Sequence, residues 1–285
     1  MSRPQRFVFV HYHLRHGGVT KVLLDHARLL SARGHHILIV HDGTSPQPLP
    51  PGCLEVVVPE FAYNSEPSPD DTSWLAASLM RQVRADFGAA PDLWHWHNPL
   101  LGKNPLLSAV CLKIIKQGEP TVLQCHDFAE DARPQNYLAL KRFFGGASFY
   151  PTGPRVHYVV STTRDQQRLQ AAGLQPDQVS LLPGIVELPQ AMHEFIDPIL
   201  QKALRRVEQQ PTLQLYPTRA ITRKNLGEFL LFSALEPEHW YATTLRPENV
   251  AEAKLHNFWQ ATIDELRLPV ELGILHGSQS SCWPL

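Results

Sequence analysis

Two cations flank a predicted strand-to-helix turn late in the chain, and together they suit an anion. Arg219 follows the apolar residues 213–216, and Lys224 stands five residues later, where a helical pattern over 225–235 begins. Arginine presents a planar fork to phosphate oxygens, and lysine adds a compact charge. With Asn225 expected as the helix cap, the turn predicts a diphosphate site that stabilises charge developing on a leaving group. The alternative is a solvated basic turn.

A pair of glycines occupies the first strand-to-helix turn of the sequence. Gly17 and Gly18 lie between a strand-like segment, 6–13, and a helical pattern over 18–33. Glycines at such a turn let backbone N–H groups approach a phosphate or a sugar at the helix N-terminus. The spacing is not the GxGxxG of dinucleotide-binding turns. A ligand-binding turn and a merely structural tight turn both fit this pattern.

Histidines stand at the ends of two further predicted strands. His95 and His97, followed by Asn98, end one strand, and His126 and Asp127 follow another. Two histidines in a His-X-His pattern on a strand point to the same face, which is a metal-ligand geometry. Yet no third and fourth ligands stand at a recognisable spacing, and a chain with 15 histidines forms close pairs easily. Histidines that hydrogen-bond a sugar or pack at a cleft wall are therefore favoured over a zinc site.

The elements that must position these residues alternate between short apolar runs and amphipathic stretches. This pattern is typical of a parallel sheet covered on both faces, and its irregular spacing favours an open doubly wound α/β fold over a closed barrel. Ligands of such sheets bind outside the carboxyl ends of the strands. The predicted strands are 6–13, 35–41, 54–58, 93–97, 121–125, 156–161 and 179–182, and the predicted helices are 18–33, 70–87, 105–116, 137–144 and 163–172.

A proline-rich stretch, 183–198, separates this series from a second one and predicts a domain boundary. We expect one Rossmann-like domain over 1–190 and another over 191–285. Three strands alone would leave a hydrophobic edge open, so the first domain is expected to be complete and the second incomplete. The second series contains strands at 213–216, 240–244 and 270–275, and helices at 225–235 and 251–267.

The composition favours a folded protein that does not bind nucleic acid. The 285 residues are 43% hydrophobic and carry a net charge of −1, which gives no electrostatic case for a polyanionic partner. Apolar runs are too short for a transmembrane segment or a signal peptide, and the four scattered cysteines favour a reducing compartment. We expect a cytoplasmic protein, with peripheral membrane contact left open.

The combination of the glycine turn, the histidine-bearing strand ends and the Arg–Lys turn resembles family 4 of the retaining glycosyltransferases, which have the GT-B fold of two Rossmann-like domains. The resemblance extends over roughly residues 6–275. The Arg–Lys turn is its most specific part. The matching positions are Gly17-Gly18, Leu29-Leu30-Ser31-Ala32-Arg33-Gly34-His35, His97-Asn98, His126-Asp127, and Arg219 with Lys224-Asn225.

The resemblance implies a role for each matching position. Gly17 and Gly18 would contact the donor diphosphate or sugar through their backbone, and Arg219 and Lys224 would clamp the diphosphate. His126 would be the catalytic-site residue, lying against the donor sugar near the reacting carbon. The residues lining the acceptor side of the cleft would be His97, Asn98 and Asp127.

The implied reaction moves a glycosyl group from a nucleotide diphosphate sugar to an acceptor hydroxyl, with retention of the anomeric configuration. The nucleotide sugar is a substrate, and no metal or other cofactor is expected, because the two cations take over the work of a divalent ion. The sequence does not identify the acceptor.

The sequence departs from the family pattern after the Arg–Lys turn. The family carries two glutamates eight positions apart, the first for the sugar and the second for the ribose. Glu228 and Glu236 have this spacing but lie on the predicted helix directly after the turn. We therefore expect a chain cut short before its second domain is complete, with impaired activity. The alternatives are a non-catalytic binding or scaffold module, and a metal-dependent hydrolase that uses His95, His97, His126 and Asp127.

Overall fold

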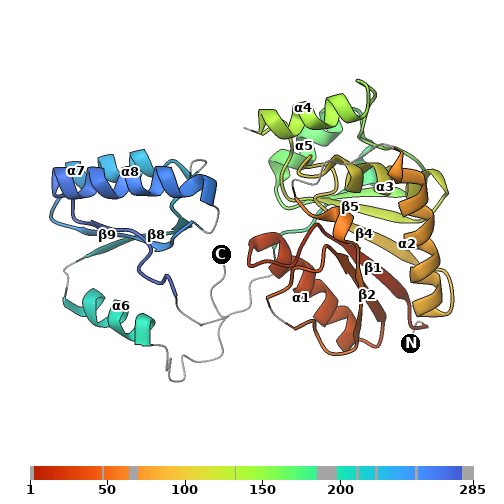
Figure 1. Cartoon of the computed structure of the whole chain (residues 1–285), viewed down its shortest axis with the longest axis horizontal. Helices are drawn as coiled ribbons and strands as arrows, with labels where there is room; N and C mark the ends of the chain where they lie inside the picture. The colour runs from red at the N-terminus through yellow and green to blue at the C-terminus, as the bar shows by residue number, and fades with distance from the viewer. Residues whose placement is uncertain are drawn as a thin grey trace. The chain divides into compact units, whose positions relative to one another are not determined.

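The computed structural model forms two compact units, Met1–Val186 and Glu187–Leu285 (Figure 1). Each unit contains a parallel sheet with helices, so the predicted α/β class is confirmed. The predicted boundary between residues 190 and 191 lies outside the described residues. The structure describes residues 3–46, 48–63, 70–131, 133–184, 198–209, 212–221, 224–247 and 250–277.

Seven parallel strands form the sheet of the first unit, in the order β3-β2-β1-β4-β5-β6-β7. The chain runs outward from β1 to β2 and β3 and then returns to β4 on the other side of β1. The winding direction therefore reverses between β1 and β4. The strands are β1 (Arg6–Val10), β2 (His36–His41), β3 (Cys53–Val57), β4 (Leu93–His97), β5 (Thr121–Cys125), β6 (Val156–Val160) and β7 (Val179–Leu181).

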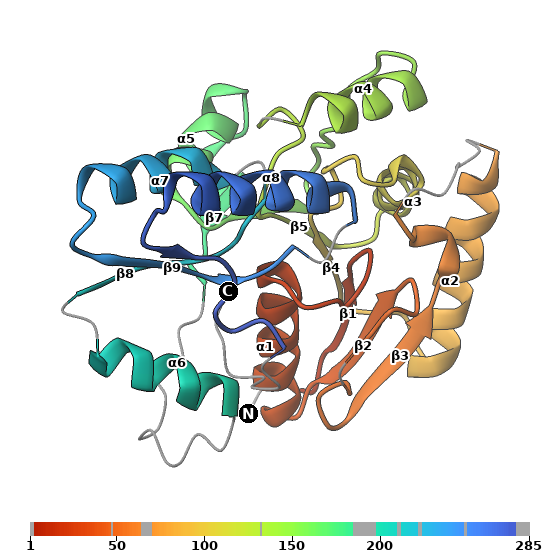
Figure 2. The ribbon, with the colours of Figure 1, turned by 60° about the vertical axis from the view of Figure 1, so that its left-hand side comes forward.

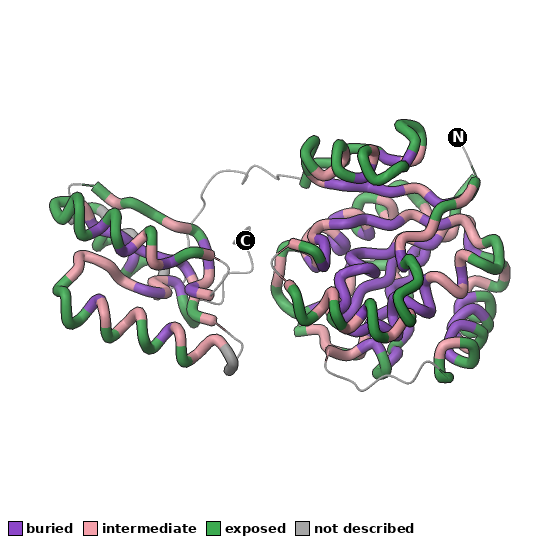
Figure 3. The backbone as a smooth tube through the Cα atoms, turned by 90° about the horizontal axis from the view of Figure 1, so that it is seen from above, coloured by how far each residue is buried: buried purple, intermediate pink, exposed green. Residues whose placement is uncertain are grey.

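Helix α1 packs on one face of this sheet, and α2 and α3 pack on the other. The buried segments gather in the strands, while the outer sides of the helices are exposed (Figure 3). The helices are α1 (Gly18–Ala32), α2 (Asp71–Phe87), α3 (Pro105–Lys116), α4 (Pro134–Phe143) and α5 (Thr163–Ala171), with short 3₁₀ turns η1 (Pro59–Phe61) and η2 (Pro176–Gln178).

Strand β4 shows how the alternation of a strand sorts its side chains. Trp94 and Trp96 are buried in the large core with α2 and α3. The rings of His95 and His97 point the other way, with centroids 5.1 and 5.8 Å from the ring of Phe9, which belongs to the core beneath α1. The two histidines therefore share the α1 face, as the His-X-His pattern predicts.

The second unit has a three-stranded parallel sheet in its described part, in the order β10-β9-β8. Helices α7 and α8 pack on one face of this sheet and α6 packs on the other (Figures 1 and 2). The elements are α6 (Pro198–Gln209), β8 (Leu213–Arg219), α7 (Leu226–Leu235), β9 (Trp240–Leu245), α8 (Val250–Leu266) and β10 (Val270–Glu271).

Two expectations about the second unit are wrong. Helix α6 was not predicted, although Pro198 at its first position is compatible with a helix start. Strand β10 is also shorter than the predicted 270–275. Gly273 has φ 72°, and a Cβ there would lie 2.6 Å from Arg246 Cγ, so the chain turns away from the sheet at this glycine.

Two features bear on the expected setting of the protein. Within the described part of the chain, no helix combines the length and the hydrophobicity that crossing a membrane requires. Cys53, Cys111 and Cys125 are free thiols. Burial raises the pKa of Cys125 to about 12 and that of Cys111 well above its ordinary value, so these two buried thiols stay protonated and unreactive at neutral pH.

Gly102 follows β4 and offers a test of the packing between this loop and α4. Its φ is 73°, and a Cβ would lie 2.5 Å from the carbonyl oxygen of Asn136. Gly102→Ala is expected to lower the free energy of unfolding by more than ~2 kcal/mol, measured by urea denaturation, because left-handed strain and a backbone clash add. Gly118→Ala is the matched control, since its φ is 84° and nothing lies within 4 Å. It should cost only about 1 kcal/mol. Equal losses would contradict the close α4 contact.

Candidate active site at the strand ends

The candidate site lies at the carboxyl ends of β1, β4 and β5, where the winding direction of the first sheet reverses. At such a point the loops leaving neighbouring strands part in opposite directions and leave room for a ligand. The structure brings His97, Asn98, His126 and Asp127 together there through direct hydrogen bonds.

Three histidines form a connected set at this edge. His97 is fully buried, and its Nδ1 lies 3.1 Å from Nε2 of His126, so one proton is shared between the two rings. The carbonyl oxygen of His97 accepts a hydrogen bond from Nδ1 of His11 at 2.9 Å. Because a carbonyl oxygen only accepts, His11 carries its proton on Nδ1. His97 at the end of β4 thus fixes the orientation of the His126 ring. His11, which follows β1, in turn supports the end of β4.

Asn98 joins the end of β4 to the end of β5. Its Oδ1 accepts hydrogen bonds from the backbone N–H of His126 at 2.7 Å and of Asp127 at 3.1 Å. Asn98 is 2% exposed and has φ 54°, a left-handed conformation that asparagine adopts more readily than most residues. Asn98 therefore acts beneath the surface and sets the positions of His126 and Asp127.

Asp127 is held from the other side by an arginine that no motif of the sequence marks. Arg133 Nη2 donates to Asp127 Oδ1 at 2.7 Å. Its Nη1 donates to the carbonyl oxygens of Phe128 and Asp131 at 3.2 and 3.0 Å. The guanidinium therefore closes the loop after β5 and neutralises the Asp127 carboxylate. The only signal in the sequence was a cation six positions after an aspartate, which is too common to select.

Burial keeps the histidines of this edge uncharged at neutral pH. It lowers the pKa of His11 to about 3 and that of His126 to about 4, in His126 against the opposing effect of Asp127. Burial and the neighbouring histidines lower the pKa of His97 well below its ordinary value. Only His126 of these three rings is partly exposed and can exchange hydrogen bonds with a ligand, and none of the three contributes positive charge.

The glycine turn stands at the start of α1. Gly17 is the N-cap residue, with φ 170° and no side-chain cap, and the first turn of α1 contains no acidic residue. The partial positive charge at this helix end is therefore not offset by a carboxylate of its own turn. A Cβ on Gly17 would meet only the carbonyl oxygen of Arg15, at 4.0 Å, so packing against the described residues does not require a glycine here.

The Arg–Lys turn lies in the second unit. Arg219 ends β8, and Lys224 comes just before α7, with the hydroxyl of Tyr216 donating to the carbonyl oxygen of Lys224 at 2.9 Å. Thr222 and Arg223 lie outside the described residues. Asn225 occupies the N-cap position as predicted, but its backbone is left-handed and its side chain makes no cap hydrogen bond.

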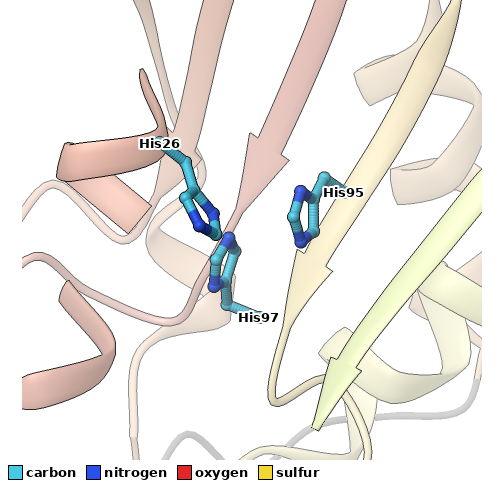
Figure 4. A group of neighbouring side chains, drawn as sticks. All are labelled: His26, His95 and His97. Atoms are coloured by element: carbon cyan, nitrogen blue, oxygen red, sulfur yellow. The ribbon is translucent and has the colours of Figure 1, made fainter. Parts of the chain in front are cut away.

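A second histidine group lies on the α1 face of the sheet (Figure 4). Within the described part of the chain, His26, His95 and His97 are the residues whose ligand atoms lie close enough together to hold a metal ion. The hydrolase alternative combines His95 and His97 with His126 and Asp127 instead, and neither of those two belongs to the group. The sequence marks His26 only as part of the helical pattern of α1.

Comparison with known proteins gives the family. The sequence model of Glycosyltransferase Family 4 matches residues 16–189, more than half of the chain, and the chain belongs to this family. Mannosylglucosyl-3-phosphoglycerate synthase of Petrotoga mobilis is 29% identical over 188 residues. That match covers 62% of this chain and 37% of the relative, so the chain matches little more than a third of that protein's length.

Solved structures support the same fold. Sucrose-phosphate synthase from Thermosynechococcus elongatus superposes with a TM-score of 0.67 at 15% identity, covering 94% of this chain and 70% of that one. HepE of Anabaena, crystallised with UDP-glucose, superposes with a TM-score of 0.64 at 12% identity, covering 94% and 68%. At these identities the likeness establishes the GT-B fold, and the predicted fold class is confirmed.

The buried histidines make stability depend on pH. Unfolded histidines bind a proton below about pH 6.5, whereas folded His11 and His126 stay neutral down to about 3 and 4. The free energy of unfolding should therefore fall as the pH drops from 6.5 towards 4, by about 1.4 kcal/mol per pH unit for each such histidine. His126→Gln should reduce the slope of the unfolding free energy against pH by the contribution of one histidine. Urea denaturation between pH 7.5 and 5 measures this slope. An unchanged slope would show that His126 is not held neutral.

Proposed function

We propose that this protein is a retaining glycosyltransferase that transfers a glycosyl group from a nucleotide diphosphate sugar to an acceptor hydroxyl. Arg219 and Lys224 carry this proposal, because they place two cations beside the start of a helix whose N-cap side chain makes no cap hydrogen bond. The donor held by the HepE structure, UDP-glucose, has the chemistry that such a turn would bind.

In this proposal the two cations hold the diphosphate through their charge, and the glycine turn is assigned backbone contacts with the donor. Arg219 and Lys224 pair with its oxygens and stabilise the charge that develops as the glycosidic bond breaks. The backbone N–H groups at Gly17 and Gly18 add hydrogen bonds at the positive end of α1. The neutral histidine edge supports this division of roles, since it offers the diphosphate no charge of its own.

His126 is assigned to the donor sugar near the reacting carbon. A neutral imidazole can donate or accept one hydrogen bond to a sugar hydroxyl, and the contact with His97 fixes its ring. His97, Asn98 and Asp127 are assigned to the acceptor side, the first two acting from beneath the surface. The Petrotoga relative is named as a synthase of a sugar–phosphoglycerate compound, which is compatible with glycosyl transfer to a small polar acceptor.

Titration calorimetry of the chain with UDP-, GDP- and ADP-sugars tests the diphosphate assignment. We expect one nucleotide class to bind, and Arg219→Ala to weaken its affinity about 10- to 150-fold, the loss of a charge-assisted hydrogen bond worth about 1.5–3 kcal/mol. Arg205→Ala, on an exposed position of α6, removes the same charge and should leave the affinity unchanged. Equal affinities for the two variants would refute the role of Arg219. Binding without transfer to any acceptor would instead favour a non-catalytic binding module.

Metal independence of donor binding is a separate expectation. Because two cations neutralise the diphosphate, the affinity for the nucleotide sugar should be the same within twofold in excess EDTA and in about 5 mM Mg²⁺. Calorimetry in the two buffers measures this directly. A strong requirement for Mg²⁺ would mean that Arg219 and Lys224 do not suffice for the diphosphate.

A further inference from the structure

We propose that His26, His95 and His97 form a binding site for one divalent transition-metal ion, with Zn²⁺ the ion whose chemistry fits best. The site lies on the α1 face of the first sheet, shares His97 with the acceptor side proposed above, and is additional to the proposed donor binding, which needs no metal. Nothing in the proposed transfer reaction uses these three side chains together.

Two elements present the three rings to one another. His95 and His97 point to the same face of β4, and their ring centroids lie 4.5 Å apart. His26 reaches towards them from α1, with its ring centroid 5.8 Å from that of His95 and 6.1 Å from that of His97 (Figure 4). Each residue offers one nitrogen, and these nitrogens all lie within 4.8 Å of one another.

The hydrogen bonds around the rings leave lone pairs for an ion. Nε2 of His97 is fully buried and has no hydrogen-bond partner, while Nδ1 of the same ring is engaged with His126. When Nδ1 donates to His126, Nε2 carries the lone pair. Nε2 of His95 lies 2.9 Å from the amide oxygen of Gln124, which only accepts, so Nδ1 carries the lone pair of that ring. Polar groups that fix the tautomer in this way are the usual outer partners of metal-binding histidines.

The unpartnered nitrogen of His97 needs an explanation. A buried polar atom without a partner costs roughly as much as a lost hydrogen bond, and Nε2 of His97 is one of several such atoms in the described residues. A metal ion at Nε2 would satisfy it. Burial also lowers the pKa of all three histidines, to about 3 for His95, so no proton has to leave before an ion binds at neutral pH.

The donor set selects the ion. Three imidazoles without a carboxylate suit zinc and its neighbours and do not suit magnesium or calcium, which prefer oxygen ligands. Zn–N distances of about 2.1 Å in a tetrahedron place two nitrogens about 3.4 Å apart. Starting from at most 4.8 Å, each nitrogen has to move by less than about 1 Å. The nearly parallel rings of His95 and His97, with an interplanar angle of 16°, also have to turn so that their in-plane lone pairs converge on the ion. The fourth position would hold water, and His26 and His95 are only partly buried, so an ion can enter from solvent.

The ion would fasten α1 to β4. His26 lies two turns into α1, and the start of the same helix is formed by Gly18. Occupancy would therefore restrain the glycine turn relative to the ends of β1 and β4 without touching the donor. This sets the expected effect on the whole protein, which is a higher Tm in the presence of the ion.

The test uses the full chain, freed of metal with a chelator and exchanged into chelator-free buffer. Zn²⁺ is then titrated by calorimetry and Co²⁺ by visible absorption, which reports tetrahedral coordination. We expect one equivalent to bind and to raise Tm. His26→Gln, at a partly exposed position where folding can be checked by circular dichroism, should weaken the affinity more than about tenfold and abolish the Tm rise. His36→Gln, at the exposed start of β2, is the matched control and should bind like the parent.

Binding by scattered surface histidines would give several weak equivalents and no difference between the two variants, and that result would overturn the proposal. So would the absence of any uptake by the parent chain. His95→Gln provides a second ligand variant and should behave like His26→Gln. The nucleotide-sugar titration is a separate measurement in EDTA, so failure of the metal site would leave the proposed glycosyl transfer untouched, and the reverse also holds.

Discussion

The arrangement of the strand ends depends on the side-chain oxygen of Asn98, which accepts backbone N–H groups from the two residues that follow β5. Parallel strands end without a shared turn, so nothing in the sheet itself fixes how one strand end stands against the next. Asn98, which follows β4 and has a left-handed backbone, directs its side-chain amide towards the end of β5 and connects the two strand ends. The positions of His126 and Asp127 follow from it, and Arg133 then holds Asp127 from the far side.

Desolvation determines the charge of the histidines at these strand ends. Packing histidines at the strand ends removes their charge, because the protonated ring would lose its hydration. The edge becomes rich in directional hydrogen-bonding groups but poor in charge. Such a surface offers hydrogen bonds of defined direction and little positive charge. The Arg–Lys turn that carries the proposed diphosphate role belongs to the second unit, at the start of α7.

The sequence predicted those parts of the structure that depend on local pattern. β4 and β5 have the predicted bounds, because short runs rich in aromatic and aliphatic residues between helical patterns mark strands. The prolines around α6 indicate a domain boundary, so the sequence does not predict this helix, and β10 ends early because a glycine allows the chain to turn. The partnership of His26 with β4 and of Arg133 with Asp127 depends on tertiary contacts, which periodicity and spacing do not encode.

The alternation along β4 also limits how this segment can change during evolution. Each of its central residues belongs to one of two unlike environments: Trp94 and Trp96 fill an apolar core, and His95 and His97 face polar partners. Substitution changes one environment at a time. Insertion or deletion of a single residue would exchange them all, burying imidazoles without partners and turning indoles towards Gln124 and His126. Length variation among relatives should therefore collect in the loops and spare this strand.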